Sequence, residues 1–111
     1  MKRYCLAVDL KDDPSLITEY EDFHKPGHVW PEVLDSLKQS GIIDAQIYRT
    51  GTRLVMILET TDEFSLEKKA VMDRDNPAVQ KWETLMWKFQ EPLPWTPAGE
   101  KWARMDPVFQ L

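Results

Sequence analysis

The stretch IIDAQIYRTGTRLVMILET, residues 42–60, contains two apolar-rich segments separated by a short turn sequence. Residues 42–49 and 53–60 are rich in β-branched side chains, which favour strands. Gly51 lies in the connection TGT and supplies the backbone freedom that a tight turn requires. The stretch therefore predicts a β-hairpin. Its second segment is apolar almost throughout, so we expect a central strand with both faces covered.

One strand and two helices are predicted before this hairpin. Residues 3–10 alternate between apolar and polar side chains, which is typical of a half-buried strand. Residues 12–23 begin with acids and Pro14 and continue with an apolar stripe, which predicts a helix. A second helix is expected to begin at Pro31, because proline suits the first helical position, and to end at Gly41.

Two further helices are predicted after the hairpin. Residues 67–72 are helical in pattern, and Asn76 is a suitable N-cap for a longer helix that begins with Pro77. The tail that follows contains four prolines and is expected to be mostly extended loop. Its last residues, 107–111, are expected to add a short strand.

The resulting order, β-α-(α)-β-β-α-(α)-β, is the split βαβ pattern of a ferredoxin-like α+β fold. Such a fold has an antiparallel sheet with helices on one face, and residues 1–111 are expected to form a single domain. The other face of so small a sheet stays bare in a monomer. We therefore expect a homodimer in which two sheets pack face to face or close into an α/β-barrel-type assembly.

The charge and apolar content exclude several classes of partner. The net charge of −5 argues against nucleic acid, because phosphate binding requires a basic surface. The longest apolar run, LVMIL, is far shorter than the roughly 20 residues of a membrane helix. Cys5, the only cysteine, lies in the alternating run of residues 3–10 and is expected to be a core thiol. Without an N-terminal signal-peptide pattern, the expected compartment is the cytoplasm.

The two histidines of the chain, His24 and His28, occur in the stretch EYEDFHKPGHVWPEV, residues 19–33. A metal site is disfavoured, because Pro26 and Gly27 break the helix between them and no further ligand pattern is present. Nucleophilic catalysis is not indicated either, since the sequence has no serine-centred elbow. His24 either caps the end of a helix or transfers protons near neutral pH. The pattern alone favours the cap and leaves the acid–base role open.

The spacing Y-x3-H-x-P followed by W-P-E resembles the L-rhamnose mutarotase family of sugar-anomer epimerases. The motif consists here of Tyr20, His24, Pro26, Trp30, Pro31 and Glu32. The resemblance continues through IYR…RLVMILE, VQKW and the terminal PVFQL, and it covers nearly the whole chain in the same order. It implies a dimeric ferredoxin-like fold that interconverts the α and β anomers of 6-deoxy-L-sugars without a cofactor.

The same resemblance implies roles for individual residues. His24 is the expected catalytic acid/base, and Tyr20 is expected to help hold the sugar. Trp82 matches the first of two adjacent pocket tryptophans in the rhamnose enzymes, and the second is Glu83 here. The expected substrate-binding residues are Tyr20, Trp30, Trp82 and Glu83, with no metal ligand.

Two other positions depart from the rhamnose enzymes. A tyrosine that lines their pocket falls at Ala45, and the inserted pair Gly27-His28 precedes the sequence VW. The form HKPGHVWPEV looks more like the branch of the family associated with L-fucose catabolism. The resemblance therefore leaves L-fucose and L-rhamnose both open as substrates.

Two alternatives remain at this stage. Cofactor-free monooxygenases acting on aromatic substrates include dimeric ferredoxin-like chains of similar size. A non-catalytic sugar-binding or structural dimer is the other alternative.

Overall fold

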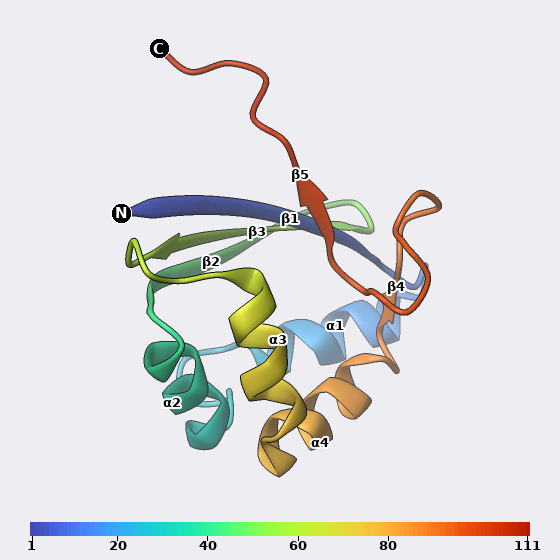
Figure 1. The fold of residues 1–111 in the computed structure, drawn as a ribbon. Helices are drawn as coiled ribbons and strands as arrows, with labels where there is room; N and C mark the ends of the chain where they lie inside the picture. Colours follow the sequence, from blue (N-terminus) through green and yellow to red (C-terminus); the bar gives the residue numbers. More distant parts are fainter.

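The computed structural model describes residues 1–111, which form one five-stranded antiparallel sheet and four helices (Figure 1). The strands and helices, in chain order, are β1 (Lys2–Leu10), α1 (Pro14–Phe23), α2 (Pro31–Gln39), β2 (Ile42–Thr50), β3 (Arg53–Thr60), α3 (Leu66–Arg74), α4 (Pro77–Met86), β4 (Gln90–Glu91) and β5 (Ala103–Met105).

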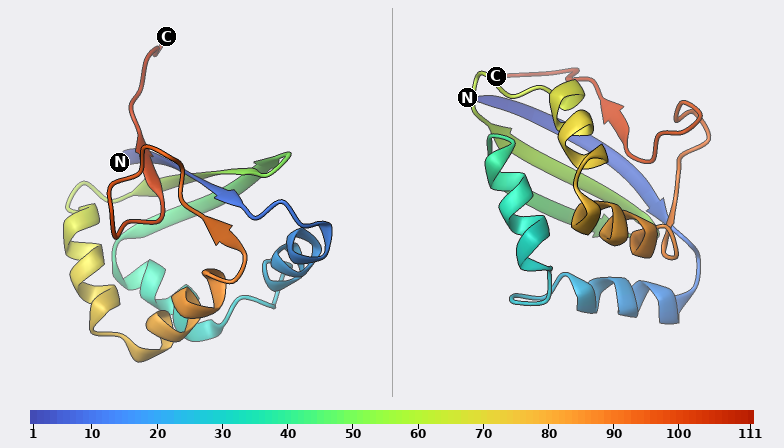
Figure 2. Two further views of the ribbon diagram at one scale, coloured as in Figure 1. Left: turned by 90° about the vertical axis from the view of Figure 1, so that its right-hand side faces the viewer. Right: turned by 60° about the horizontal axis from the view of Figure 1, so that its bottom comes forward.

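The sheet has the strand order β2-β3-β1-β4, and β5 also pairs with β1. The order places β3 between its hairpin partner β2 and the first strand, as expected for a split βαβ unit. All four helices lie on the same side of the sheet (Figures 1 and 2). The predicted ferredoxin-like α+β fold is confirmed. None of the helices is long and apolar enough to cross a membrane.

Side-chain caps explain where several helices begin. The Asp13 carboxylate accepts hydrogen bonds from the backbone N–H groups of Ser15 and Leu16 at the start of α1. The Asn76 amide oxygen does the same for Ala78 and Val79 in α4, which confirms the predicted cap. Such caps satisfy N–H groups that have no partner within the helix.

The helix-facing side of the sheet forms the core. Leu54 and Leu58 of β3 are each only 2% exposed and face the helices. The largest buried cluster joins this face to α1, α2 and α4; its buried members are Val8, Leu10, Tyr20, Val33, Leu54, Trp82, Met86 and Phe89. The alternation of strand side chains produces this arrangement, because every second residue points to the same face.

The opposite face of the sheet differs from the prediction. Val55 and Ile57 of β3 point away from the helices and are only half-buried. The expectation that both faces of this strand are covered is wrong for the single chain. The reason is that no helix lies on this side (Figure 2).

The prediction of a strand at residues 107–111 is also wrong. The last strand, β5, lies earlier and pairs with Cys5–Ala7 of β1. Beyond it the tail leaves the sheet (Figure 1), and the side chains of Val108 and Phe109 are 98% and 80% exposed. Pro107 has no N–H group to continue the ladder.

Candidate active site

His24 ends helix α1 and is held by a hydrogen bond within that helix. Its backbone N–H contacts the carbonyl groups of Glu21 and Asp22, so the residue is the C-cap. Its Nδ1 atom lies 2.7 Å from the backbone oxygen of Tyr20. A carbonyl oxygen only accepts hydrogen bonds, so Nδ1 carries the hydrogen. In the neutral imidazole, Nε2 therefore keeps a free lone pair.

The surroundings of His24 keep the ring neutral. The Tyr20 ring stacks on it at a centroid distance of 4.2 Å, and the Trp82 ring contacts it at 5.6 Å with an interplanar angle of 67°. Burial among these rings lowers the pKa of His24 below 6.5, and the hydrogen bond to Tyr20 opposes this shift only in part. Burial has this effect because it disfavours the charged imidazolium. His24 is thus a neutral base at neutral pH.

A cavity of about 880 Å³ lies beside His24, on the helix side of the sheet. Its lining is mostly apolar and includes Leu6, Met56 and Leu58 from the central strands. Polar side chains from α3, α4 and the C-terminal tail complete the wall, among them Glu83 and Lys101. This combination of an apolar wall with a few polar groups is usual for small-molecule sites.

Tyr20 and Trp30 lie behind the cavity wall. Tyr20 is 3% exposed, and its hydroxyl accepts a 3.4 Å hydrogen bond from the Gln90 amide. Burial raises the pKa of Tyr20 well above its ordinary value, and the charge of Glu83 adds to this effect. Trp30 packs edge-on against Trp82 at a centroid distance of 5.2 Å. Neither residue lines the cavity, whereas His24 and Trp82 both do.

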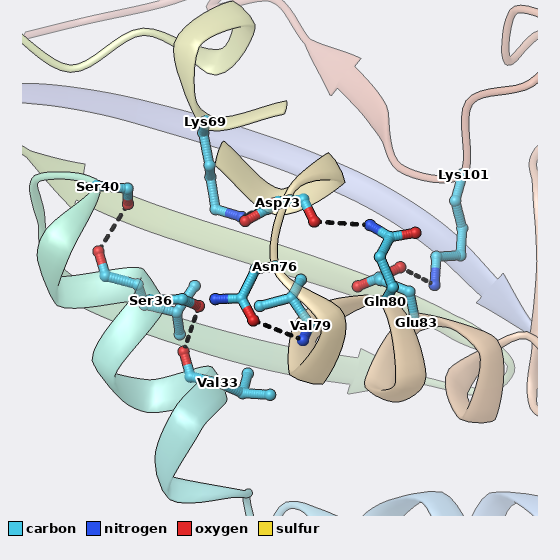
Figure 3. Close-up of polar contacts among 11 residues, drawn as sticks. Val33, Ser36, Ser40, Lys69, Asp73, Asn76, Val79, Gln80, Glu83 and Lys101 are labelled. Atoms are coloured by element: carbon cyan, nitrogen blue, oxygen red, sulfur yellow. Dashed lines mark hydrogen bonds and ion pairs between the residues drawn. The ribbon is translucent and has the colours of Figure 1, made fainter. Parts of the chain in front are cut away.

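Glu83 and Lys101 form an ion pair at the cavity wall (Figure 3). Oε2 of Glu83 on α4 lies 2.5 Å from Nζ of Lys101, which comes from the tail just before β5. Glu83 was expected at the site from the family resemblance, whereas Lys101 was not expected there. No sequence signal marks this lysine, because it lies in the proline-rich tail and meets Glu83 only in the folded chain. A second ion pair at the cavity, Lys69 with Asp73, lies within α3 (Figure 3).

The residues 3–111 match the family model described as L-rhamnose mutarotase. The chain belongs to the L-rhamnose mutarotase family. An L-fucose mutarotase of Xanthomonas campestris pv. campestris is 45% identical over 111 residues, which span 100% of this chain and 89% of that protein. An L-rhamnose mutarotase of Jannaschia sp. (strain CCS1) is 28% identical over 114 residues, 100% of this chain and 99% of that protein. The crystal structure of an L-rhamnose mutarotase from Formosa agariphila matches with a TM-score of 0.72 and 18% identity, covering 100% of this chain and 99% of that chain.

This member of the mutarotase family has a small side chain at one part of the cavity wall. Ala45 lies opposite Leu58 in the β2–β3 ladder and lines the cavity. Together with Glu83, it stands where the resemblance implies aromatic side chains in the rhamnose enzymes. The wall thus presents a methyl group at Ala45 and a carboxylate at Glu83.

The other histidine, His28, lies away from this cavity. It is exposed, and its Nδ1 donates a 2.6 Å hydrogen bond to the backbone oxygen of Asp22. The two histidines thus bind different backbone carbonyl groups. Within residues 1–111 no three His, Cys, Asp or Glu side chains are grouped closely enough to hold a metal ion.

Proposed function

We propose that this protein is a mutarotase that interconverts the α and β pyranose anomers of a 6-deoxy-L-hexose. The observation that carries the proposal is the place of His24 at the wall of a largely apolar cavity, with Nδ1 bound to the Tyr20 carbonyl oxygen, which leaves Nε2 as the basic nitrogen. L-Fucose is the first candidate substrate, because the 45% identical relative is an L-fucose mutarotase. The replacements at Ala45 and Glu83 agree with a sugar other than L-rhamnose.

The proposed reaction needs only proton transfer. Nε2 of His24 takes the proton from the anomeric hydroxyl O1, the C1–O5 bond breaks, and C1 becomes an aldehyde carbon. The ring oxygen O5 then receives a proton. Because O1 and O5 are both bonded to C1, one imidazole reaches both and passes the proton from the first to the second. Rotation about the C1–C2 bond exposes the other carbonyl face, and the reverse steps close the ring.

The remaining site residues either contact the sugar or support the residues that do. Trp82 offers an apolar face to the methyl and C–H groups of the sugar, and Glu83 accepts hydrogen bonds from its hydroxyls. We assign supporting roles to Tyr20 and Trp30, because they pack behind His24 and Trp82. Tyr20 also supplies the carbonyl oxygen that fixes the His24 tautomer.

Saturation-transfer NMR on equilibrated sugars tests this function. Irradiation of one anomeric proton of L-fucose is expected to reduce the signal of the other when the protein is present. L-Rhamnose is measured in parallel, and D-glucose serves as a sugar that has a hydroxymethyl group in place of the methyl. Binding of L-fucose or L-rhamnose without faster exchange of either would refute the proposal.

We also propose that two copies of the chain associate through the bare face of the sheet. Val55 and Ile57 are half-buried there, and Tyr48 is 58% exposed on the neighbouring strand. Sedimentation velocity is expected to show a dimer for the native protein and a monomer for Ile57→Lys. Met72→Lys, which changes a 41% exposed apolar residue on α3, serves as the control and is expected to stay dimeric.

The compartment proposed for this enzyme is the cytoplasm. Its one cysteine, Cys5, is a half-buried free thiol and has no partner within the chain for a disulfide. Disulfide-free chains of this kind are usual in reducing compartments. Fluorescence microscopy of the tagged protein in its own cells checks the assignment.

A further inference from the structure

Lys101 is a buried cation that the proposed reaction does not use. Its side chain is 7% exposed, although lysine is almost never fully buried unless it is paired. Nζ lies 2.5 Å from the Glu83 carboxylate and 5.0 Å from the centre of the Trp87 ring. The contact with Glu83 is an ion pair without regular hydrogen-bond geometry, and Nζ makes no other polar contact in the chain.

Stability alone explains this ion pair poorly. Removing a charge from water is costly, and an apolar residue of similar size in the same place is often equally stable or more so. The tail is also held independently of the pair. Ala103 pairs with Ala7 of β1 and is buried with it, and Trp102 packs against the core. Lys101 is therefore not required to hold the tail on the sheet.

The two partners of the pair are buried to different extents. The Lys101 side chain is 7% exposed, but the Glu83 side chain is 41% exposed, and both line the cavity. Arg104, another cation that lines the cavity, lies over the Tyr4 ring at 5.3 Å instead of contacting Glu83. Lys101 is thus the cation that contacts the Glu83 carboxylate from its buried side.

Glu83 and His24 line the same cavity. The His24 ring also contacts the ring of Trp82, the residue next to Glu83 on α4. A carboxylate in this place has acceptor capacity for more than one sugar hydroxyl.

We propose that Lys101 is a positioning residue that fixes the Glu83 carboxylate at the cavity, where it binds the hydroxyl groups of the sugar. The inference rests on the proposed function and deepens it, because it assigns part of the sugar site to the C-terminal tail. In this arrangement Lys101 does not touch the sugar. It prevents the glutamate side chain from turning away, so less rotamer entropy is lost when the sugar binds.

The test compares Lys101→Met with Glu83→Gln and the double variant, using NMR exchange kinetics with L-fucose. Loss of a hydrogen bond to a charged group corresponds to about a 10- to 100-fold change. We expect Lys101→Met and Glu83→Gln each to raise KM by about tenfold or more while kcat changes by less than about threefold. The double variant is expected to be no worse than Glu83→Gln alone, because both changes remove the same contact.

Lys88→Met is the matched control. Lys88 also contacts a glutamate, Glu19 at 3.2 Å, and an aromatic ring, Phe89 at 5.3 Å. It is 54% exposed and does not line the cavity, so its loss is expected to leave KM unchanged. Lys101→Arg keeps the charge and is expected to restore a large part of the affinity.

Two outcomes would overturn the role of Lys101. One is a native KM in Lys101→Met, with or without a loss of thermal stability, as a purely structural lysine would give. The other is a double variant in which the two single effects on KM multiply. The proposed function is judged separately, because it fails when the native protein exchanges neither sugar.

Discussion

Replacing His24 by Asn is the most direct test of the proposed chemistry. An asparagine amide has an N–H donor close to the position of Nδ1, so it keeps the hydrogen bond to the Tyr20 carbonyl oxygen, which measures 2.7 Å in the native chain. It has no basic nitrogen in place of Nε2. The variant therefore separates the capping role of His24 from its role as a base.

The expected loss of activity is large and the expected loss of stability is small. General acid–base catalysis contributes about 10²- to 10⁴-fold, so kcat/KM for anomer exchange should fall by about that factor. His24→Asn also loses the ring contacts with Tyr20 and Trp82, and such contacts are worth about 0.5–1.5 kcal/mol each. We expect the free energy of unfolding to fall by about 1–3 kcal/mol. His24→Ala should lose about 1 kcal/mol more, because it also removes the hydrogen bond.

Saturation-transfer NMR measures the activity of this variant, and urea denaturation measures its stability. His28→Asn is the matched control, because His28 makes the same type of hydrogen bond to a backbone carbonyl but lies away from the cavity. It is expected to keep native activity. The reasoning would be refuted if His24→Asn retained more than about a tenth of native kcat/KM, or if the two variants lost equal activity.

Three further predictions follow from the burial and backbone of particular residues. Because burial lowers the pKa of His24 below 6.5, kcat/KM should rise with pH through that lowered value, and a pH-rate profile should show more than half of the plateau at pH 6.5. Trp82→Ala should reduce the free energy of unfolding by about 3–5 kcal/mol, measured with urea, whereas Trp95→Ala should cost under about 1 kcal/mol, because the exposed fractions are 6% and 67%. Gly41→Ala should lower thermal stability more than Gly99→Ala: both have positive φ, but only at Gly41 would a Cβ atom clash, 2.8 Å from Thr61 Oγ1.

The fold was predictable because its decisive signals are local. The β2–β3 hairpin follows from the two apolar segments and Gly51, and the start of α4 follows from Asn76. The tail was not predictable in the same way. The strand β4 has only two residues, and its pairing with β1 decides its existence. Likewise, β5 forms where the tail lies alongside the free edge of β1. The more apolar residues 107–111 form no strand, because the tail has left the sheet before it reaches them.

In the candidate site, too, the residues marked by local signals were predictable, and those that depend on contacts in the folded chain were not. A short motif within one helix turn indicated His24, because Tyr20 and His24 lie four residues apart and therefore on the same helix face. Trp82 and Glu83 were indicated only through the family resemblance. Lys101 could not be predicted, because its importance comes from a contact between the tail and α4. The burial of Tyr20 behind the cavity wall was not predictable either, because an apolar helix stripe does not indicate which of its residues line a cavity.

The sequence left two interpretations of His24 open, a helix cap or a proton carrier. The geometry is compatible with both roles at once. The cap consists of a hydrogen bond from Nδ1 to the Tyr20 carbonyl oxygen. That bond fixes the hydrogen on Nδ1, so the neutral ring must present Nε2 as a base. Burial by Tyr20 and Trp82 then keeps the ring neutral. The contact that ends the helix is therefore the contact that prepares the base, and a residue that preserves only the cap should preserve the fold without the reaction.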